Sequence, residues 1–397
     1  MPSSDPTIPL SVPRLAGNEW AYVKECLDTN WVSYVGPFVD RFERELAVRT
    51  GAAVAVATSS GTAALHVALR LAGVEADDEV AMPGLTFVAP ANAVRYVGAW
   101  PLFGDIRADD WQWDVERFAR FLETGCAARG GRLVNRTTGR RLAALLPVHL
   151  LGGMGDVDAW AELAAKYELP LIEDAAECLG ATCKGRPIGA PVPGFRGPFR
   201  LVATSFNGNK IITTGGGGAL LAEDAALAAR AKHLTTTAKA DKIEFFHDEV
   251  GYNYRLTNLA AALGVAQLEQ LDRHVELKRA IAARYADGLG GVPGVRPHPE
   301  PAGCRSTFWM YSALLPGAAR PVVDRLNAAG VMARPIWMPL VRLPAFAGAA
   351  PAMDMPVIED LYHRGISLPC SAGLEAPEQE RVVGTLRECL ASAAAVR

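Results

Sequence analysis

The chain has 397 residues and a formal net charge of −3, with 50% hydrophobic and 21% charged residues. This balance excludes a basic nucleic-acid binder and a disordered polyelectrolyte, and the length predicts a large domain and a smaller one. The N-terminal residues lack the charged and apolar regions of a signal peptide, and no window is apolar enough to span a bilayer. We therefore expect a cytoplasmic protein without a membrane partner.

The first half of the chain alternates helical and strand-like patterns. Residues 38–49 are amphipathic at helical spacing, 52–57 form a short apolar run, and 61–73 return to helical spacing. The alternation then continues, with strand-like runs at 79–83, 99–103, 141–149 and 169–174 separated by helix candidates at 87–98, 114–123 and 156–168. Strands that alternate with helices predict a mostly parallel sheet covered on both faces.

Two polar connections and a long helix interrupt or follow this alternating pattern. Residues 122–141 and 184–200 are rich in Gly, Pro or Arg, so we expect loops there. A continuous helix is predicted over 257–286, followed by a turn. After it, strand-like runs at 306–315 and 366–369 and helical patterns at 321–330 and 378–390 predict a compact α+β end domain. We place the large domain at 1–255 and the small one at 256–397.

The cysteines are scattered without a CxxC pair or a Cys/His cluster. This pattern argues against a metal site and against a disulfide framework, so we expect buried, reduced thiols. The residues concerned are Cys26, Cys126, Cys178, Cys183, Cys304, Cys370 and Cys389.

Lys210 lies between a short apolar run and a Gly-rich run, in TSFNGNKIITTGGGG. Small flanking residues allow a bulky planar ligand to approach the backbone. A nucleotide-phosphate loop would need GxxxxGK followed by Ser or Thr, whereas Ile211 follows the lysine here and the glycines come after it. A lysine that forms a Schiff base in a cofactor pocket is the interpretation that remains.

A second segment, LPLIEDAAECLGA, places Glu173 and Asp174 at the end of an apolar strand. Carboxylates at this edge of an α/β sheet often bind ligands, although Asp174 could equally cap a helix. Its occurrence about 36 residues before Lys210 favours the functional reading. A carboxylate that keeps a pyridine nitrogen protonated is what makes pyridoxal phosphate an electron sink.

A third segment, AVAVATSSGTAALHVAL, has Ser60, Gly61 and Thr62 between a strand and a helix. Free backbone N–H groups at a helix start can bind a phosphate. Many helices begin with Ser or Thr as a simple cap, so both interpretations stay open for this segment alone.

Six motifs in this order resemble the nucleotide-sugar aminotransferases of the DegT or StrS type, which are fold-type-I pyridoxal-phosphate enzymes. They are SSGTAALHVAL, MPGLTFVAPANAV, PVHLLGG, IEDAAECLGA, SFNGNKIITTGGGG and GYNYRLTNLAAALG. The resemblance extends from about residue 8 to residue 285. It implies a large, mostly parallel α/β domain, a smaller C-terminal α+β domain and pyridoxal 5'-phosphate as cofactor.

The resemblance also implies roles for individual residues. Lys210 would bind the cofactor covalently and move the proton during amino transfer, while Asp174 would pair with the pyridine nitrogen. Phe87 would stack on the ring, and Glu177 would lie near its phenolic oxygen. His149, in PVHLLGG, is as often a structural residue as a catalytic one, so we leave it out of the site.

The phosphate and the subunit interface are linked in the same family pattern. Ser205 would join Gly61 and Thr62 on the phosphate. Asn253 would reach that phosphate from a neighbouring subunit, so the resemblance implies a homodimer with shared active sites.

The segment 17–39 looks closest to the branch that aminates 4-keto-6-deoxy sugars. We expect L-glutamate as amino donor and a nucleotide-linked sugar as acceptor, UDP-linked and 2-acetamido in type. The candidate substrate contacts are aromatic, hydroxyl and guanidinium groups, each of which could instead be packed or ion-paired. They are Trp31, Ser33, Tyr34, Arg255, Arg334 and Trp337.

Three alternatives compete with this assignment. A sugar 3-aminotransferase would share the motifs. A related sugar dehydratase would carry His in place of Lys210, and a non-catalytic sensor or scaffold should have lost Lys210 or Asp174. Both residues are present.

Overall fold

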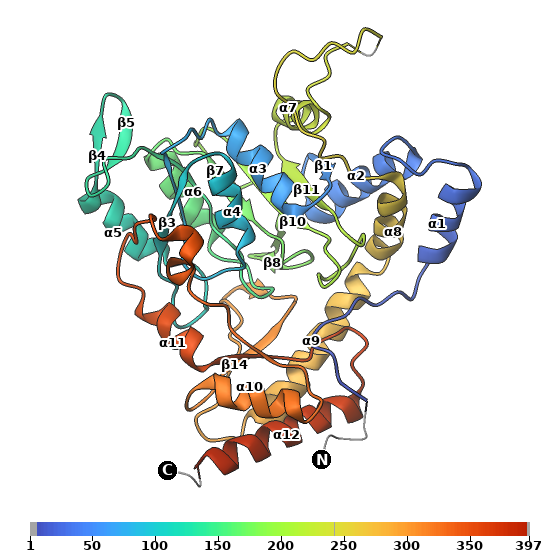
Figure 1. Cartoon of the computed structure of the whole chain (residues 1–397), viewed down its shortest axis with the longest axis vertical. Coiled ribbons are helices and arrows are strands. Elements are labelled where there is room, and N and C mark those ends of the chain that lie inside the picture. Colours follow the sequence, from blue (N-terminus) through green and yellow to red (C-terminus); the bar gives the residue numbers. More distant parts are fainter. Residues whose placement is uncertain (1–5, 242, 395–397) are drawn as a thin grey trace.

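A seven-stranded sheet forms the centre of the larger body in the computed structural model, which describes residues 6–241 and 243–394 (Figure 1). Its strands, in spatial order, are β1 (Val54–Thr58), β11 (Gly218–Ala222), β10 (Arg200–Ser205), β7 (Leu171–Asp174), β6 (Leu142–Leu145), β2 (Glu79–Pro83) and β3 (Trp100–Gly104). Only β11 runs antiparallel to its neighbours. The predicted mostly parallel sheet is confirmed.

Helices follow most of these strands along the chain, as the alternating pattern predicted. They are α2 (Pro37–Thr50), α3 (Gly61–Leu71), α4 (Ala89–Tyr96), α5 (Val115–Gly125), α6 (Val157–Lys166) and α7 (Ala225–Thr235). Several begin at a side chain that accepts a backbone N–H, as Ser60 does for α3 and Asp156 for α6. α3 packs on β10 and β11, and its apolar face is buried. This packing fixes the start of α3 at the carboxyl edge of β1.

The C-terminal region contains a second, four-stranded antiparallel sheet. Its order is β12 (Arg296–Pro297), β14 (Tyr311–Leu314), β16 (Gly365–Leu368) and β15 (Arg334–Pro335). The helical elements of this region are α10 (Ala319–Ala328), α11 (Pro356–Arg364), α12 (Ala376–Ala394) and two 3-10 turns, η1 (Leu340–Arg342) and η2 (Pro344–Phe346). The predicted α+β character is confirmed, but the strand expected over 306–315 forms only at 311–314.

The prediction of a single helix over 257–286 is wrong. The structure has two helices, α8 (Asn258–Leu268) and α9 (Leu271–Leu289), separated at Glu269 and Gln270. α8 packs on α1 (Glu19–Asp28) and α2, whereas α9 contacts α12 and so joins the two bodies (Figure 1). Different partners require different helix directions, and no Gly or Pro marks the break. A domain boundary at residue 255 stays a prediction.

Residues 122–141 were expected to be a loop, but they contain a hairpin. Its strands are β4 (Cys126–Arg129) and β5 (Arg132–Asn135), joined at two glycines with positive φ. Gly130 and Gly131 adopt left-handed conformations that other residues rarely take, which permits the tight turn. The Gly-Gly pair between two short runs was the signal for this hairpin.

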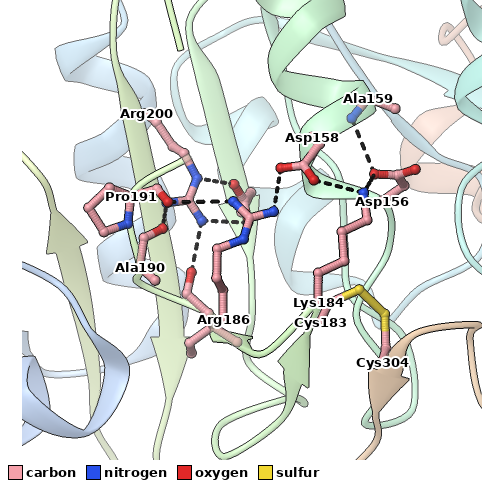
Figure 2. A network of polar contacts seen from close by, with 12 residues as sticks. Asp156, Asp158, Ala159, Cys183, Lys184, Arg186, Ala190, Pro191, Arg200 and Cys304 are labelled. Atoms are coloured by element: carbon pink, nitrogen blue, oxygen red, sulfur yellow. Dashed lines mark hydrogen bonds and ion pairs between the residues drawn. A yellow bond between two sulfur atoms is a disulfide. The ribbon is translucent and has the colours of Figure 1, made fainter. Parts of the chain in front are cut away.

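The cysteine prediction is wrong for one pair. Cys183 and Cys304 form a disulfide across a sequence separation of 121 residues (Figure 2). They are directly opposite in a three-stranded sheet of β13 (Cys304–Arg305), β8 (Thr182–Cys183) and β9 (Arg186–Pro187). Facing positions on antiparallel strands bring side chains close together, and sequence spacing does not reveal this register. Among the described residues the other five cysteines are free and buried.

Across residues 6–241 and 243–394, no helix is both long and apolar enough to cross a membrane. Residues 1–5, which contributed to the expectation about a signal peptide, lie outside the described residues.

The first described residues pair with the C-terminal region, where Ile8 bridges Val331 and Leu10 accepts a hydrogen bond from Cys370.

Candidate active site

A cavity of about 750 Å³ is lined by both bodies of the molecule. Its walls come from the carboxyl ends of β7 and β10, the start of α3, the loop after β10 and the strands of the C-terminal sheet. Ten of the residues singled out from the sequence line it: Ser60, Gly61, Thr62, Phe87, Asp174, Glu177, Ser205, Lys210, Arg334 and Trp337. A ligand site at this edge is where an α/β sheet is expected to bind one.

The start of α3 forms a cradle that is too tight for larger residues. A Cβ on Gly61 would lie 2.9 Å from the Cβ of Ser205, and one on Gly218 would lie 2.4 Å from the nitrogen of Gly61. Ser60 caps the helix by accepting the N–H of Ala63 at 3.0 Å. The helix dipole and the free N–H groups at this end favour an anion.

Lys210 extends from the loop after β10 into the cavity. Its Nζ lies 3.5 Å from Oε1 of Glu177 and 4.0 Å from the ring centre of Trp309. Burial raises the pKa of Glu177, an effect that the Lys210 charge and the N–H of Leu151 only partly offset. A carboxylate and an aromatic face therefore both contact the lysine amino group.

Asp174 occupies the end of β7 and is 5% exposed. Its carboxylate accepts the N–H of Ala176 at 2.9 Å. Burial raises the pKa of Asp174, and the Ala176 N–H and the charge of Lys210 act against this rise. A cationic N–H in the cavity would give this buried carboxylate a strong partner.

A buried charge network lies next to Asp174. Glu173 pairs with Arg200 and with Nε2 of His149, the latter at 2.9 Å. Burial acts to raise the pKa of Glu173, but Arg200 and His149 outweigh it and lower the pKa to about 2. His149 accepts the N–H of Gly155 through Nδ1 at 3.1 Å, so both of its ring nitrogens have partners. The structural reading of His149 agrees with these contacts.

Arg200 is held in turn by the segment that follows β9 (Arg186–Pro187). Its guanidinium donates to the carbonyls of Ile188 and Ala190 at 2.8 and 3.0 Å (Figure 2). On the same side of the molecule, Arg186 and Lys184 bind Asp158 at the start of α6 (Figure 2). Hydrogen bonds from Arg200 therefore tie the segment expected to be a loop, 184–200, to β10, and ion pairs tie it to α6.

Phe87 lines the cavity and is 54% exposed, a high value for a large apolar side chain. Thr86, directly before it, is buried in the same wall. An exposed aromatic face inside a cavity is suited to stack on a planar ligand.

Five residues singled out from the sequence do not line this cavity. Asn253 is exposed and bridges Thr236, and Arg255 lies over the ring of Tyr34 at 4.4 Å. Trp31 and Ser33 are also exposed, in the connection between α1 and α2. None of the five lines the cavity of its own chain, although Arg255 bridges Thr58, close to the start of α3.

The sequence did not single out several other lining residues, among them a group in the C-terminal region. Arg320 and Tyr362 line the outer part of the cavity beside Arg334. Trp309 stacks with Trp337 at 6.4 Å between ring centres. Neither periodicity nor spacing links these residues to Lys210, because the small sheet brings them there.

The model of the DegT/DnrJ/EryC1/StrS aminotransferase family matches residues 13–387. The chain belongs to this aminotransferase family. It is 40% identical to EpsN of Bacillus subtilis (strain 168), named as a pyridoxal phosphate-dependent aminotransferase, over 95% of this chain and 94% of the relative. GDP-perosamine synthase of Caulobacter vibrioides (strain ATCC 19089 / CIP 103742 / CB 15) is 36% identical over 97% of this chain and 99% of its own.

Solved structures agree with this assignment. The crystal structure of DesV from S. venezuelae superposes with a TM-score of 0.84 at 30% identity and covers 97% of this chain and 98% of that chain. The family match and these relatives confirm the expected fold-type-I class, the pyridoxal-phosphate cofactor and the nucleotide-sugar aminotransferase class.

The residues of the cavity fit this cofactor. The cradle at Gly61 suits a phosphate, the buried Asp174 suits a protonated ring nitrogen, and Lys210 has an amine of the kind that covalent attachment requires. All three line one cavity.

Proposed function

We propose that the protein transfers the amino group of L-glutamate to C4 of a nucleotide-linked 4-keto-6-deoxyhexose, UDP-linked and 2-acetamido in type. The observation that carries the proposal is the cavity in which Lys210 faces Glu177 while Asp174 and the cradle at Gly61 line the same walls. Pyridoxal phosphate supplies an electron sink when bound, and the protein supplies orientation and proton transfer.

The residues would divide this work among themselves. Ser60, Gly61, Thr62 and Ser205 bind the phosphate through backbone and hydroxyl groups at the start of α3. This end of the cofactor does not react, so its binding positions the part that does.

The pyridine ring of the cofactor and its substituents would contact the other walls of the cavity. Asp174 keeps the ring nitrogen protonated, Phe87 packs on the ring face, and Glu177 lies near the phenolic oxygen. Lys210 binds the cofactor covalently at rest, and its amino group carries the proton during transfer.

A homodimer would complete the site. Asn253 lies on the surface and not in its own cavity, so it is free to reach the phosphate of a second copy. Large apolar side chains are exposed in the same part of the molecule, in the loop 31–35 and at residues 243–250. Exposed apolar surface of this kind marks a protein interface.

The acceptor would enter from the outer end of the cavity. Arg334 and Arg320 offer guanidinium groups for a diphosphate or a carboxylate, and Trp337 offers an aromatic face. Trp31, Ser33, Tyr34 and Arg255 would contribute from the second subunit, since none of them lines the cavity of its own chain. Binding of the remote nucleotide then positions the keto group.

The test is the reverse reaction with 4-amino-sugar nucleotides and 2-oxoglutarate, followed by glutamate formation. We expect turnover with UDP-linked 2-acetamido substrates, less with GDP-linked ones, and at least about 100-fold lower kcat/KM with the free amino sugar, because the nucleotide supplies binding energy. Lys210→Ala is the matched control: it should bind cofactor without a borohydride-stable bond and show no turnover.

Activity confined to 3-amino sugars, or equal rates with free and nucleotide-linked sugars, would contradict the acceptor assignment. Faster turnover of the GDP-linked substrate would show that the acceptor carries GDP and not UDP, and it would leave the proposed reaction class unchanged. A borohydride-trapped cofactor on the Lys210→Ala protein would contradict the role of Lys210.

A further inference from the structure

Trp309 connects the C-terminal region directly to the catalytic lysine. It lies between β13 and β14 and is 4% exposed. Its indole Nε1 donates a 2.7 Å hydrogen bond to the carbonyl of Asn209, the residue before Lys210. The centre of its ring is 4.0 Å from Nζ of Lys210. One side chain thus contacts both the backbone beside Lys210 and the amino group at its tip.

The backbone around Trp309 is held in an unusual conformation. Phe308 has a φ of 47°, a left-handed conformation that is rare for an aromatic residue. Gly152 approaches so closely that a Cβ on it would lie 2.5 Å from the nitrogen of Trp309. The N–H of Thr307 donates to the carbonyl of Gly152 at 3.0 Å. Such local strain persists only where the surroundings fix it.

A buried lysine holds the other side of the same segment. Lys278, in α9, is 3% exposed, and its ammonium donates to the carbonyls of Trp309 at 2.8 Å and Cys370 at 2.7 Å. Burying a lysine is unfavourable unless its donors find acceptors. The contacts of Lys278 therefore tie Trp309 to the helix that joins the two bodies.

We propose that Trp309 is a positioning residue for Lys210: its ring face and the carboxylate of Glu177 hold the lysine amino group in place whenever it is not bound to the cofactor. The proposal rests on the proposed function, because transamination requires that Lys210 be released and bound again in every cycle. A lysine side chain has a flexible four-carbon stem, so without such contacts its amino group would occupy many positions. An aromatic face attracts an ammonium group, most strongly where water is excluded.

A purely structural role for Trp309 makes a different prediction. If the indole only forms a wall of the cavity, its loss should weaken the binding of every form of the cofactor. If it positions Lys210, its loss should affect only the step that uses the lysine. Pyridoxamine phosphate separates the two cases, because it has no aldehyde and forms no bond with Lys210.

The experiment uses full-length apo-protein with Trp309→Leu and Trp309→Phe, and Trp20→Leu as a matched control. Trp20 is 79% exposed in α1 and does not line the cavity. The first measurement is the dissociation constant of pyridoxamine phosphate. The second is the rate of covalent attachment of pyridoxal phosphate by absorbance, checked by borohydride trapping. In this step the neutral amine nitrogen of Lys210 bonds to the aldehyde carbon, and the aldehyde oxygen leaves as water with the two amine protons.

We expect Trp309→Leu to slow attachment by roughly 2- to 10-fold, the factor that corresponds to ordering one rotamer-rich side chain near the aldehyde. Its affinity for pyridoxamine phosphate should stay within about twofold of wild type. Trp309→Phe keeps an aromatic face and should restore most of the attachment rate, and Trp20→Leu should match wild type. Thermal melting establishes that each variant is folded, and Trp309→Met replaces the leucine variant if that one does not fold.

Equal loss of pyridoxamine-phosphate affinity and attachment rate would overturn the positioning role, as would an unchanged attachment rate in the folded leucine or methionine variant. Failure of the wild-type protein itself to attach pyridoxal phosphate would overturn the proposed function and this inference with it. A defect limited to Trp309 variants, with normal attachment in wild type, bears on the inference alone.

Discussion

Glu173 and Arg200 form a buried ion pair beside the cavity carboxylate Asp174. Their side chains are 1% and 3% exposed, so neither charge is stabilised by water. Such a pair adds little net stability, but removing one partner leaves the other charge buried and alone. Because Glu173 and Asp174 are consecutive in β7, the pair also fixes the strand end from which Asp174 enters the cavity.

The first residue-scale prediction concerns Glu173→Gln. At pH 7 the substitution should lower the free energy of unfolding by about 3 kcal/mol, because Arg200 loses its buried counter-charge and keeps only the partly exposed Glu223. The pKa of Glu173 is lowered to about 2 from an ordinary 4.5. The carboxylate therefore stabilises the fold fully above pH 4.5, and this contribution is lost as pH falls from 4.5 toward 2.

Urea unfolding of wild type and variant between pH 7 and pH 3.5 measures this difference. The difference in unfolding free energy between wild type and Glu173→Gln should be constant above about pH 5.5 and should decrease below pH 4.5. Glu123→Gln is the control, since Glu123 pairs with Lys166 on the surface and its loss should cost at most about 1 kcal/mol. A gap that widens in acid would contradict the assignment.

At the scale of elements, the short strand β13 anchors the segment that carries Trp309. Cys304 in β13 is bonded to Cys183 in β8, and Trp309 follows five residues later. Disulfides are rare in reducing compartments, so this pair argues against the expected cytoplasmic location. The bond closes a large loop between the two bodies, and such closure lowers the entropy of the unfolded chain.

The element-scale prediction is that oxidised protein loses about 2–4 kcal/mol of unfolding free energy when Cys183 and Cys304 are both changed to Ser. Denaturant titrations with and without reductant measure this. Reductant should destabilise the wild type by a similar amount and leave the double variant unchanged. Free-thiol counts in denaturant provide the independent check. Equal sensitivity of both proteins to reductant would show that another effect is responsible.

At the scale of the whole molecule, the exposed apolar residues lie away from the C-terminal helices. Residues 243–250 belong to a projection beside α7, at the opposite end of the molecule from α10 and α12 (Figure 1). Ile243 is 87% exposed, and Phe245 and Phe246 are also largely exposed. A closed two-fold dimer would cover such a surface and bring Asn253 of each copy toward the other's cavity.

The whole-molecule prediction follows from that geometry. Mixing Lys210→Ala and Asn253→Ala subunits should restore about one quarter of wild-type activity, because half of the dimers are hybrids and each hybrid has one intact site. Mixing Lys210→Ala with Asp174→Ala is the control, since both residues line the cavity of the same chain. No recovery after verified subunit exchange would place Asn253 outside the partner's site.

The sequence by itself determined most of the local elements of the large sheet, and it singled out ten of the residues that line the candidate site. The period of the apolar residues predicted the strands and helices of the large sheet, because burial on one face repeats along each element. Ser60 follows β1, Asp174 ends β7 and Lys210 lies in the loop after β10, and the carboxyl ends of these strands share one edge of the sheet. Their meeting in one cavity therefore followed from the order of the elements.

Only the tertiary structure decided what packs across that edge. The break between α8 and α9, the bond between Cys183 and Cys304 and the position of Trp309 all depend on contacts between segments far apart in the chain. No local pattern in the sequence reveals these contacts. Residues 257–286 also suit an uninterrupted helix, Cys183 and Cys304 also suit two free thiols, and the segment around Trp309 also suits a buried strand. Contacts between distant segments select among these alternatives, because they fix helix directions and strand registers that the hydrophobic period leaves open.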